Sequence, residues 1–163
     1  MPAEVVFTQV TDAAGLARLD DALRALSADI AEEYATDRAA LARAVLGPMV
    51  AACGLLALRD AETVGAALYS PTFSTVRGAA GVYVSDLWVA RGVRGRGLGA
   101  RLLAQVAAAG RARWGATWLR LAAYPHSHDA LAFYARLGFT PAEAQHELRL
   151  APEATETLIR RAG

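Results

Sequence analysis

A glycine-rich turn separates two apolar runs of different periodicity near the middle of the sequence. The turn reads Arg94-Gly95-Arg96-Gly97-Leu98-Gly99-Ala100; a β-rich run at 81–89 precedes it and an amphipathic run at 97–114 follows. Glycines let a backbone turn tightly and approach a ligand, and the first turn of a helix offers unpaired N–H groups with partial positive charge. Seven arginines and no acid lie between Asp86 and Asp129. The pattern predicts a site for a phosphorylated ligand.

The turn formally matches the dinucleotide pattern G-x-G-x-x-G/A. That pattern needs an acid about 20 residues later for the ribose, and none occurs before Asp129. Arg120 could bind a 2′-phosphate instead, so NADP binding stays an alternative. The chain has no lysine, which excludes a P-loop. The arginine segment also lacks the interleaved aromatics of a nucleic-acid surface, so we expect no nucleic-acid partner.

Length and composition predict one globular domain over residues 1–163. Hydrophobic residues make up 55% and charged residues 20% of the chain, and the net charge is +1. No apolar run is long enough to span a membrane, and the N-terminus shows no secretory pattern, so we expect a cytoplasmic protein without a membrane partner. The single Cys53 lies in an apolar run and is expected to fill the core.

Hydrophobic periodicity predicts a mixed α/β domain, in which helices and antiparallel strands come first and a β-α-β-α segment follows. The expected strands are 5–10, 54–58, 63–69, 81–89, 117–123 and 147–150, and the expected helices are 11–26, 37–46, 97–114 and 128–137. A polar segment closes the chain.

Two motifs at a fixed separation carry a family resemblance. Arg94-x-x-Gly97-x-Gly99, preceded by Leu87-Trp88-Val89, resembles the acetyl-CoA signature of the GCN5-related N-acetyltransferases, and residues 130–139 resemble that family's second signature. The resemblance covers roughly residues 50–150. More narrowly, residues 73–89 are similar to the diamine and thialysine acetyltransferase branch.

The resemblance implies a fold, a cosubstrate and an assembly. The expected fold is a central, mostly antiparallel mixed sheet flanked by helices, with strands splayed at the cofactor site. Acceptor-side helices would cover about 12–46 and an acetyl-CoA-binding core about 81–140. Acetyl-CoA would be the cosubstrate without a metal, and the protein would be a homodimer.

The resemblance also assigns the cofactor site. Backbone groups of 87–89 would pair with the pantetheine arm, and the amides of the turn would bind the pyrophosphate. Tyr134 would protonate the departing thiolate as a general acid. Ser127 stands where the family has an asparagine that contacts the cofactor. The implied cofactor-binding residues are Leu87, Trp88, Val89, Arg94, Gly95, Arg96, Gly97, Leu98, Gly99, Ser127 and Tyr134.

The general base is left open. The branch has a glutamate where this chain has Ser85, and strict strand alternation points the adjacent Asp86 to the opposite face. His126, His128 and a water chain are alternatives. An acidic segment lies where family members bind the acceptor and suits a cationic amine; its residues are Asp29, Glu32, Glu33 and Tyr34.

These expectations together describe an acetyl-CoA-dependent N-acetyltransferase. It would transfer acetyl directly to a primary amine of a small molecule such as a polyamine or amino acid. The main alternative is a catalytically impaired module that binds acyl-CoA for regulation, because the glutamate and asparagine of the family are absent at Ser85 and Ser127.

Overall fold

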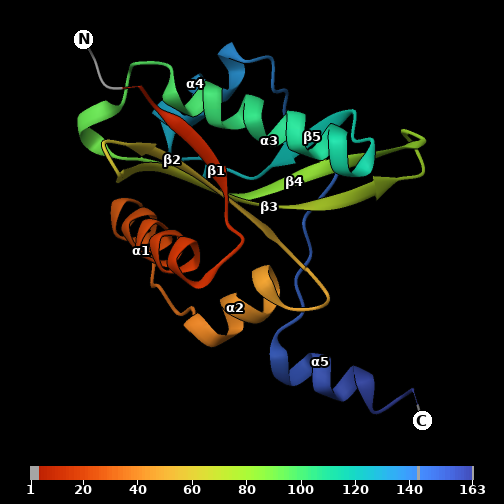
Figure 1. The fold of residues 1–163 in the computed structure, drawn as a ribbon. Coiled ribbons are helices and arrows are strands. Elements are labelled where there is room, and N and C mark those ends of the chain that lie inside the picture. The colour runs from red at the N-terminus through yellow and green to blue at the C-terminus, as the bar shows by residue number, and fades with distance from the viewer. Residues whose placement is uncertain (1–3, 143, 163) are drawn as a thin grey trace. The chain divides into compact units, whose positions relative to one another are not determined.

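The computed structural model describes residues 4–142 and 144–162 (Figure 1). The chain forms two compact units, Met1–Tyr124 and Pro125–Gly163. A single domain over 1–163 stays a prediction, and residues 1–3, 143 and 163 of that range lie outside the described residues. The N-terminal unit contains β1 (Val6–Gln9), α1 (Ala13–Asp29), α2 (Arg38–Leu46), β2 (Cys53–Arg59), β3 (Glu62–Ser74), β4 (Ala79–Val89), η1 (Arg91–Val93), α3 (Leu98–Trp114) and β5 (Trp118–Leu121).

The N-terminal unit is built around a mixed sheet, as the sequence predicts. Its strands follow the order β1-β2-β3-β4-β5, with antiparallel neighbours up to β4 and a parallel β5. Helices α1 and α2 cover one face, and α3 covers the other (Figure 1). On the α3 face the helix packs closely against the sheet, because a Cβ at Gly110 would overlap a methyl of Val82. The order of elements confirms the prediction that helices and antiparallel strands come first and that a βαβ unit follows.

Strands β4 and β5 separate halfway along β4. Their parallel pairing runs from Gly81–Trp118 to Val84–Leu121, whereas β4 continues to Val89 beside β3. The N–H of Ala90 donates to Val64 O of β3 at 2.9 Å. Because backbone groups alternate in direction along a strand, those of Leu87 and Val89 face the open edge. The predicted splay at residues 87–89 is thus present.

A β-bulge interrupts β4 at Ser85. Val84 lies opposite Tyr69 and Asp86 lies opposite Leu68, so Ser85 is the extra residue on its strand. Tyr69 stacks edge-on against Trp114 of α3, which puts the Val84–Tyr69 pair on the α3 face. Leu68 packs instead against the core under α1. The bulge therefore turns Asp86 toward the α1 face, and strict alternation along β4 was the wrong expectation.

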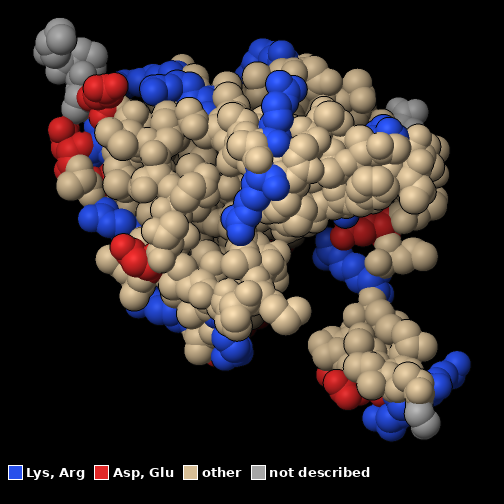
Figure 2. Space-filling view, turned by 45° about the vertical axis from the view of Figure 1, so that its right-hand side comes forward, with Lys and Arg blue, Asp and Glu red and all other residues tan. Residues whose placement is uncertain are grey.

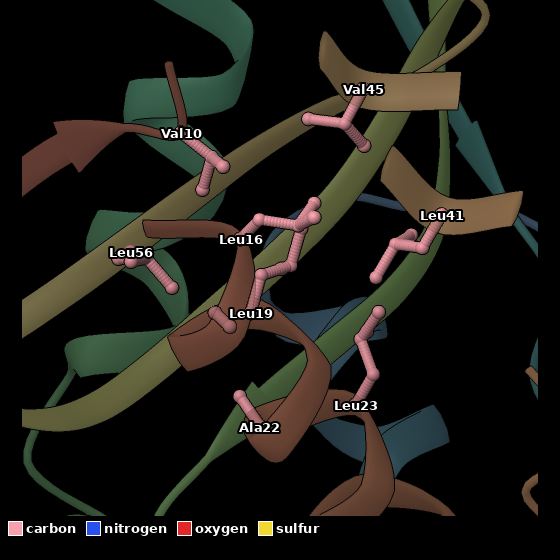
Figure 3. Packing of buried hydrophobic residues seen from close by; sticks show 9 residues of the cluster. Val10, Leu16, Leu19, Ala22, Leu23, Leu41, Val45 and Leu56 are labelled. Atoms are coloured by element: carbon pink, nitrogen blue, oxygen red, sulfur yellow. The ribbon is translucent and has the colours of Figure 1, made fainter. Parts of the chain in front are cut away.

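The core under α1 joins both early helices to the sheet. Leucines and valines from α1, α2 and β2 point toward one another in Figure 3. Leu19 and Leu56 are 0% and 1% exposed. Asp12 caps α1 by accepting from Gly15 N at 2.7 Å, and Asp37 caps α2 by accepting from Ala39 N at 3.1 Å. These caps confirm the helix starts that the sequence predicts.

One charged side chain is buried beside this core. Asp20 of α1 is 1% exposed and accepts from Tyr34 Oη at 2.6 Å and from Arg38 Nε at 2.9 Å. Arg24 lies 3.7 Å away on the same helix. Burial raises the pKa of Asp20, but these hydrogen bonds and charges outweigh it and hold the pKa below 3.8. The network fixes residues 34–38, the connection to α2, against α1.

Removing this carboxylate should destabilise the N-terminal unit. We expect Asp20→Ala to lower the free energy of unfolding by about 2–3 kcal/mol, because the Tyr34 hydroxyl and the arginines lose a buried, charged acceptor. The exposed neighbour Asp21 is the control, and Asp21→Ala should stay within about 0.5 kcal/mol. Since the folded pKa of Asp20 is depressed, its contribution is present above the unfolded pKa and disappears as the pH falls below 3.8. Urea unfolding at several pH values measures both effects; equal stability of the two variants would contradict the network's role.

The C-terminal unit contains α4 (His128–Arg136) and α5 (Pro152–Ile159). Helix α4 confirms the prediction for 128–137, whereas the strand predicted at 147–150 is wrong. Those residues have no regular secondary structure, and Leu148 is 90% exposed. A four-residue alternation forms a strand only where a neighbouring strand can pair with it. Helix α5 was missed in the polar tail, although Pro152 in its first turn is a typical start signal.

Candidate active site

The glycine-rich turn forms an open backbone loop at the start of α3. Gly95 and Gly97 have φ angles of 72° and 79°, in the left-handed region that favours glycine, and Gly97 is the N-cap of α3. A Cβ at either position would meet nothing within 4 Å. Leu98, the first helical residue, is 5% exposed and anchors the helix in the core. The amides of this turn are thus presented to open space beside a helix N-terminus, which suits a pyrophosphate.

The side chain of Arg94 is engaged within the protein. Its Nε donates to Val89 O at 2.8 Å and its Nη2 donates to Asp29 Oδ2 at 2.5 Å. Arg91 pairs with the other oxygen of the same carboxylate at 2.8 Å. Burial raises the pKa of Asp29, but hydrogen bonds from Arg91, Arg94 and Trp88 outweigh it and lower the pKa. The loop therefore offers a ligand its backbone amides rather than the Arg94 guanidinium.

The rest of the acid-free arginine stretch divides among separate contacts. Arg101 lies over the ring of Phe7, and Arg120 lies over the ring of Tyr83. Arg113 lies over Trp114 and contacts the buried thiol of Cys53 at 3.0 Å. On the face shown in Figure 2, basic side chains lie in several groups rather than in one patch. The segment's total charge is thus spread over several local sites.

Asp86 combines burial with the absence of a cationic partner among the described residues. Burial raises the pKa of its carboxyl group, and a hydrogen bond from Ser85 opposes this in part. The Ser85 hydroxyl also lies 3.1 Å from Leu68 O. It carries one proton, so it donates to one of these two acceptors at a time. A half-buried carboxylate with a raised pKa, on the face of the sheet that α1 covers, has the properties of a general base.

The residues of the acidic segment at the end of α1 have different partners. Asp29 is bound by arginines, and the Tyr34 hydroxyl donates to Asp20. Burial, together with the neighbouring Asp20 carboxylate, raises the pKa of Tyr34 to about 12. Glu32 and Glu33 are exposed, and neither forms an ion pair within the described ranges. These two carboxylates are the acids of the segment that remain open to a cation.

Tyr134 and Ser127 belong to α4 in the C-terminal unit. The ring of Tyr134 packs against Phe133 and Phe139 at centroid distances of 5.1 and 5.5 Å. Burial raises the pKa of this phenol, which keeps it protonated at neutral pH. Ser127 is the N-cap residue of α4, but its side chain makes no capping hydrogen bond.

Sequence reasoning missed two features that shape this site. Asp20 went unnoticed, although it lies four residues after Leu16, on the apolar stripe of α1. An acid on such a stripe indicates a buried polar partner. The bulge at Ser85 was also missed, and local sequence carries no comparable signal for it.

Comparison with known proteins identifies the class. The family model described as the acetyltransferase (GNAT) family matches residues 21–139, and the chain belongs to this family. The chain is thus an N-acetyltransferase of a family that uses acetyl-CoA. Sequence comparison with curated proteins gives no match.

Solved structures show the same fold at low sequence identity. An integron cassette protein from the mobile metagenome of V. cholerae has a TM-score of 0.77 at 19% identity, covering 96% of this chain and 98% of that chain. Ribosomal-protein-alanine N-acetyltransferase from Brucella melitensis biovar Abortus 2308 has a TM-score of 0.68 at 18% identity, covering 90% and 100%. An aminoglycoside acetyltransferase from an uncultured soil metagenomic sample has a TM-score of 0.72 at 16% identity, covering 90% and 94%.

Two further observations concern the described part of the chain. Its helices are all too short or too polar to cross a membrane. Its His, Cys, Asp and Glu side chains form no group of three that could hold a metal ion.

Proposed function

We propose that the protein transfers the acetyl group of acetyl-CoA directly to a primary amine of a small cationic molecule. Asp86 is the general base and Tyr134 the general acid. The observation that carries this proposal is the bulge at Ser85. It places a half-buried carboxylate without a cationic partner on the face of the sheet that α1 covers, where β4 leaves β5.

The open loop and the splayed strand fit the cosubstrate. Turn amides from Gly95 to Gly99 bind the pyrophosphate, and the backbone groups of Leu87 and the N–H of Val89, which face the open edge, hold the pantetheine arm. An N–H at this edge also hydrogen-bonds the thioester carbonyl as negative charge develops on its oxygen. Bound acetyl-CoA supplies an activated acyl group. Ser127, in the C-terminal unit, is proposed to contact the cosubstrate through its hydroxyl in place of the family asparagine.

The residues of the chain account for the proton movements. The carboxylate of Asp86 takes a proton from the acceptor ammonium, which frees the nitrogen lone pair to attack the carbonyl carbon. As the C–S bond breaks, the Tyr134 phenol gives its proton to the sulfur. The nitrogen, which is positively charged after the attack, loses its second proton to water and becomes the neutral amide. Each group regains its starting protonation state by exchange with solvent. The reaction therefore needs neither a metal nor a covalent acyl-enzyme.

The acceptor class is proposed from charge. Glu32 and Glu33 are exposed acids on the acceptor side, and polyamines or basic amino acids would pair with them, as in the diamine branch. Aminoglycosides are also polycationic, and one structural neighbour is an aminoglycoside acetyltransferase. Thiol release from acetyl-CoA, measured with polyamines, lysine analogues, aminoglycosides and an alanine-terminated peptide, separates these classes. Tight CoA binding without turnover of any amine would favour the regulatory module instead.

The assembly and location are proposed from the family resemblance alone. We expect a homodimer in the cytoplasm. Light scattering coupled to size exclusion tests the first, and a monomer at micromolar concentration would reject it.

Gly97→Ala should weaken CoA binding about tenfold. An alanine at positive φ costs about 1–2 kcal/mol and shifts the turn, and its methyl occupies the open space where we propose that the pyrophosphate binds. Gly92→Ala is the matched control: Gly92 also has open space around its missing Cβ, but its φ is not positive. Calorimetric titration with CoA measures both variants. Equal affinities would show that the turn does not bind the pyrophosphate.

A further inference from the structure

Both oxygens of one carboxylate at the end of α1 are occupied by donors from β4 and the turn after it. Oδ2 of Asp29 accepts from Trp88 Nε1 at 3.2 Å and from Arg94 Nη2 at 2.5 Å. Oδ1 accepts from Arg91 Nε at 2.9 Å, and Arg91 Nη2 lies 2.8 Å away. These partners are about 60 residues away in sequence. The contact therefore ties the last residue of an acceptor-side helix to the cofactor side of the site.

This cluster differs from an ordinary surface salt bridge. Exposed pairs contribute little to stability, because water and salt screen them. Here the Asp29 side chain is only 17% exposed and one carboxylate serves three donor side chains. Arg94 additionally donates to Val89 O, so its guanidinium is fixed at both ends. Hydrogen bonds between a carboxylate and two guanidinium groups fix the orientation of the side chains in addition to pairing their charges.

We propose that Asp29 is a positioning residue that fixes the cofactor-binding turn, rather than a residue that binds the acceptor cation. This inference rests on the proposed function. Its carboxylate is saturated with donors, so an acceptor ammonium would have to displace an arginine to reach it. By holding Arg91 and Arg94 against the end of α1, Asp29 sets where the chain enters the turn at Gly95. The amides that follow are thereby aligned for an anion before any ligand arrives.

The first test needs no ligand. In folded protein, trypsin cuts after Arg91, Arg94 and Arg96 only when the turn opens locally. In Asp29→Asn the initial cleavage rate at these bonds, followed by mass spectrometry, should rise about tenfold, because the turn loses its charged hydrogen bonds. Asp21→Asn is the matched control on the same helix, since Asp21 is 75% exposed, and its rate should equal that of the wild type. Equal cleavage in all three proteins would overturn the proposal.

The second test separates positioning from acceptor binding. Asp29→Asn should raise the KM for acetyl-CoA and the Kd for CoA about tenfold, while the KM for the amine and kcat change less than about twofold. A raised amine KM with an unchanged acetyl-CoA KM would assign Asp29 to the acceptor. Tighter CoA binding would mean that the carboxylate competes with phosphate for the arginines. Either result overturns the inference.

A replacement variant and the binding of CoA to the wild type distinguish a failed positioning role from a failed proposed function. If Asp29→Asn does not fold, Arg91→Gln replaces it, because Arg91 is 76% exposed and its removal opens only one side of the cluster. This variant has no trypsin site at residue 91, so cleavage after Arg94 and Arg96 is followed, and it should show the same changes to a smaller extent. If wild-type protein binds no CoA, the proposed function fails, whereas wild-type binding with an unaltered Asp29→Asn variant rejects the positioning role alone.

Discussion

Asp86→Asn is expected to lower kcat/KM for the amine about 100- to 10,000-fold, the usual contribution of a general base. The substitution keeps the size of the side chain and its place opposite Leu68, but it removes the group that accepts the ammonium proton. Binding of CoA should be unchanged, since the turn at the start of α3 is not touched. Steady-state rates with the best amine of the acceptor panel, together with calorimetric CoA titration, measure the two effects.

Stability should move in the opposite direction to activity. Because burial raises the folded pKa of Asp86 above 3.8, the ionised carboxylate destabilises the fold at neutral pH. The stability associated with its protonated form is present below the unfolded pKa and is lost as the pH rises through the folded pKa. Asp86→Asn should therefore melt at the same temperature as the wild type or higher at pH 7. Asp60→Asn, in the exposed turn between β2 and β3, is the control and should leave activity unchanged.

The pH profile identifies the base. Wild-type kcat/KM should show an acid limb at a pH above 3.8, where Asp86 becomes protonated. That limb should be absent from the residual activity of Asp86→Asn. Full activity of the variant would assign the base to His126, His128 or a water chain, and a lost activity accompanied by a lower melting temperature would indicate structural damage instead.

Tyr134→Phe is expected to slow the chemical step about 100-fold or more, because the departing thiolate loses its proton donor. The half-buried ring packs against Phe133 and Phe139, so phenylalanine fits the same space. Single-turnover mixing of enzyme-bound acetyl-CoA with amine reports the chemical step even where product release limits kcat. The affinity for CoA should stay within about twofold of the wild-type value.

The control is Tyr83→Phe, which removes a hydroxyl from a half-buried tyrosine of β4. Its single-turnover rate should match the wild type. Because burial raises the Tyr134 pKa above 10, the wild-type rate should hold through neutral pH and fall only above pH 10. An undiminished rate in Tyr134→Phe would mean that water protonates the thiolate.

Most of the fold could be predicted because its signals are local. The hydrophobic periodicity of α1 and the starts of α1 and α2 near residues 11 and 37 are short-range patterns that the structure reproduces. The Gly97 turn and the start of α3 are equally local, because only glycine adopts that φ at little cost. The strand at 147–150 failed for the converse reason: its alternation was local, but a strand needs a partner that no local pattern supplies.

In the candidate site, too, local patterns could be predicted and contacts between distant residues could not. Two motifs that resemble the family's signatures were enough to predict the acetyltransferase class, whereas the anion-binding turn and the role of Tyr134 stay predictions. The motifs were not enough to predict which acids act together. Asp29 was grouped with Glu32 and Glu33 by proximity in sequence, yet its partners are Trp88, Arg91 and Arg94.

By itself, then, the sequence determined the class of protein: a glycine turn between a strand and a helix, followed by a second signature, is a property of neighbouring residues. Only the tertiary structure decided which face of the sheet carries the Asp86 carboxylate. A one-residue bulge at Ser85 reverses the alternation of β4 and brings Asp86 to the α1 face. A bulge depends on the register between two strands, so it is fixed by the pairing of β3 with β4 and not by the residues of either strand alone.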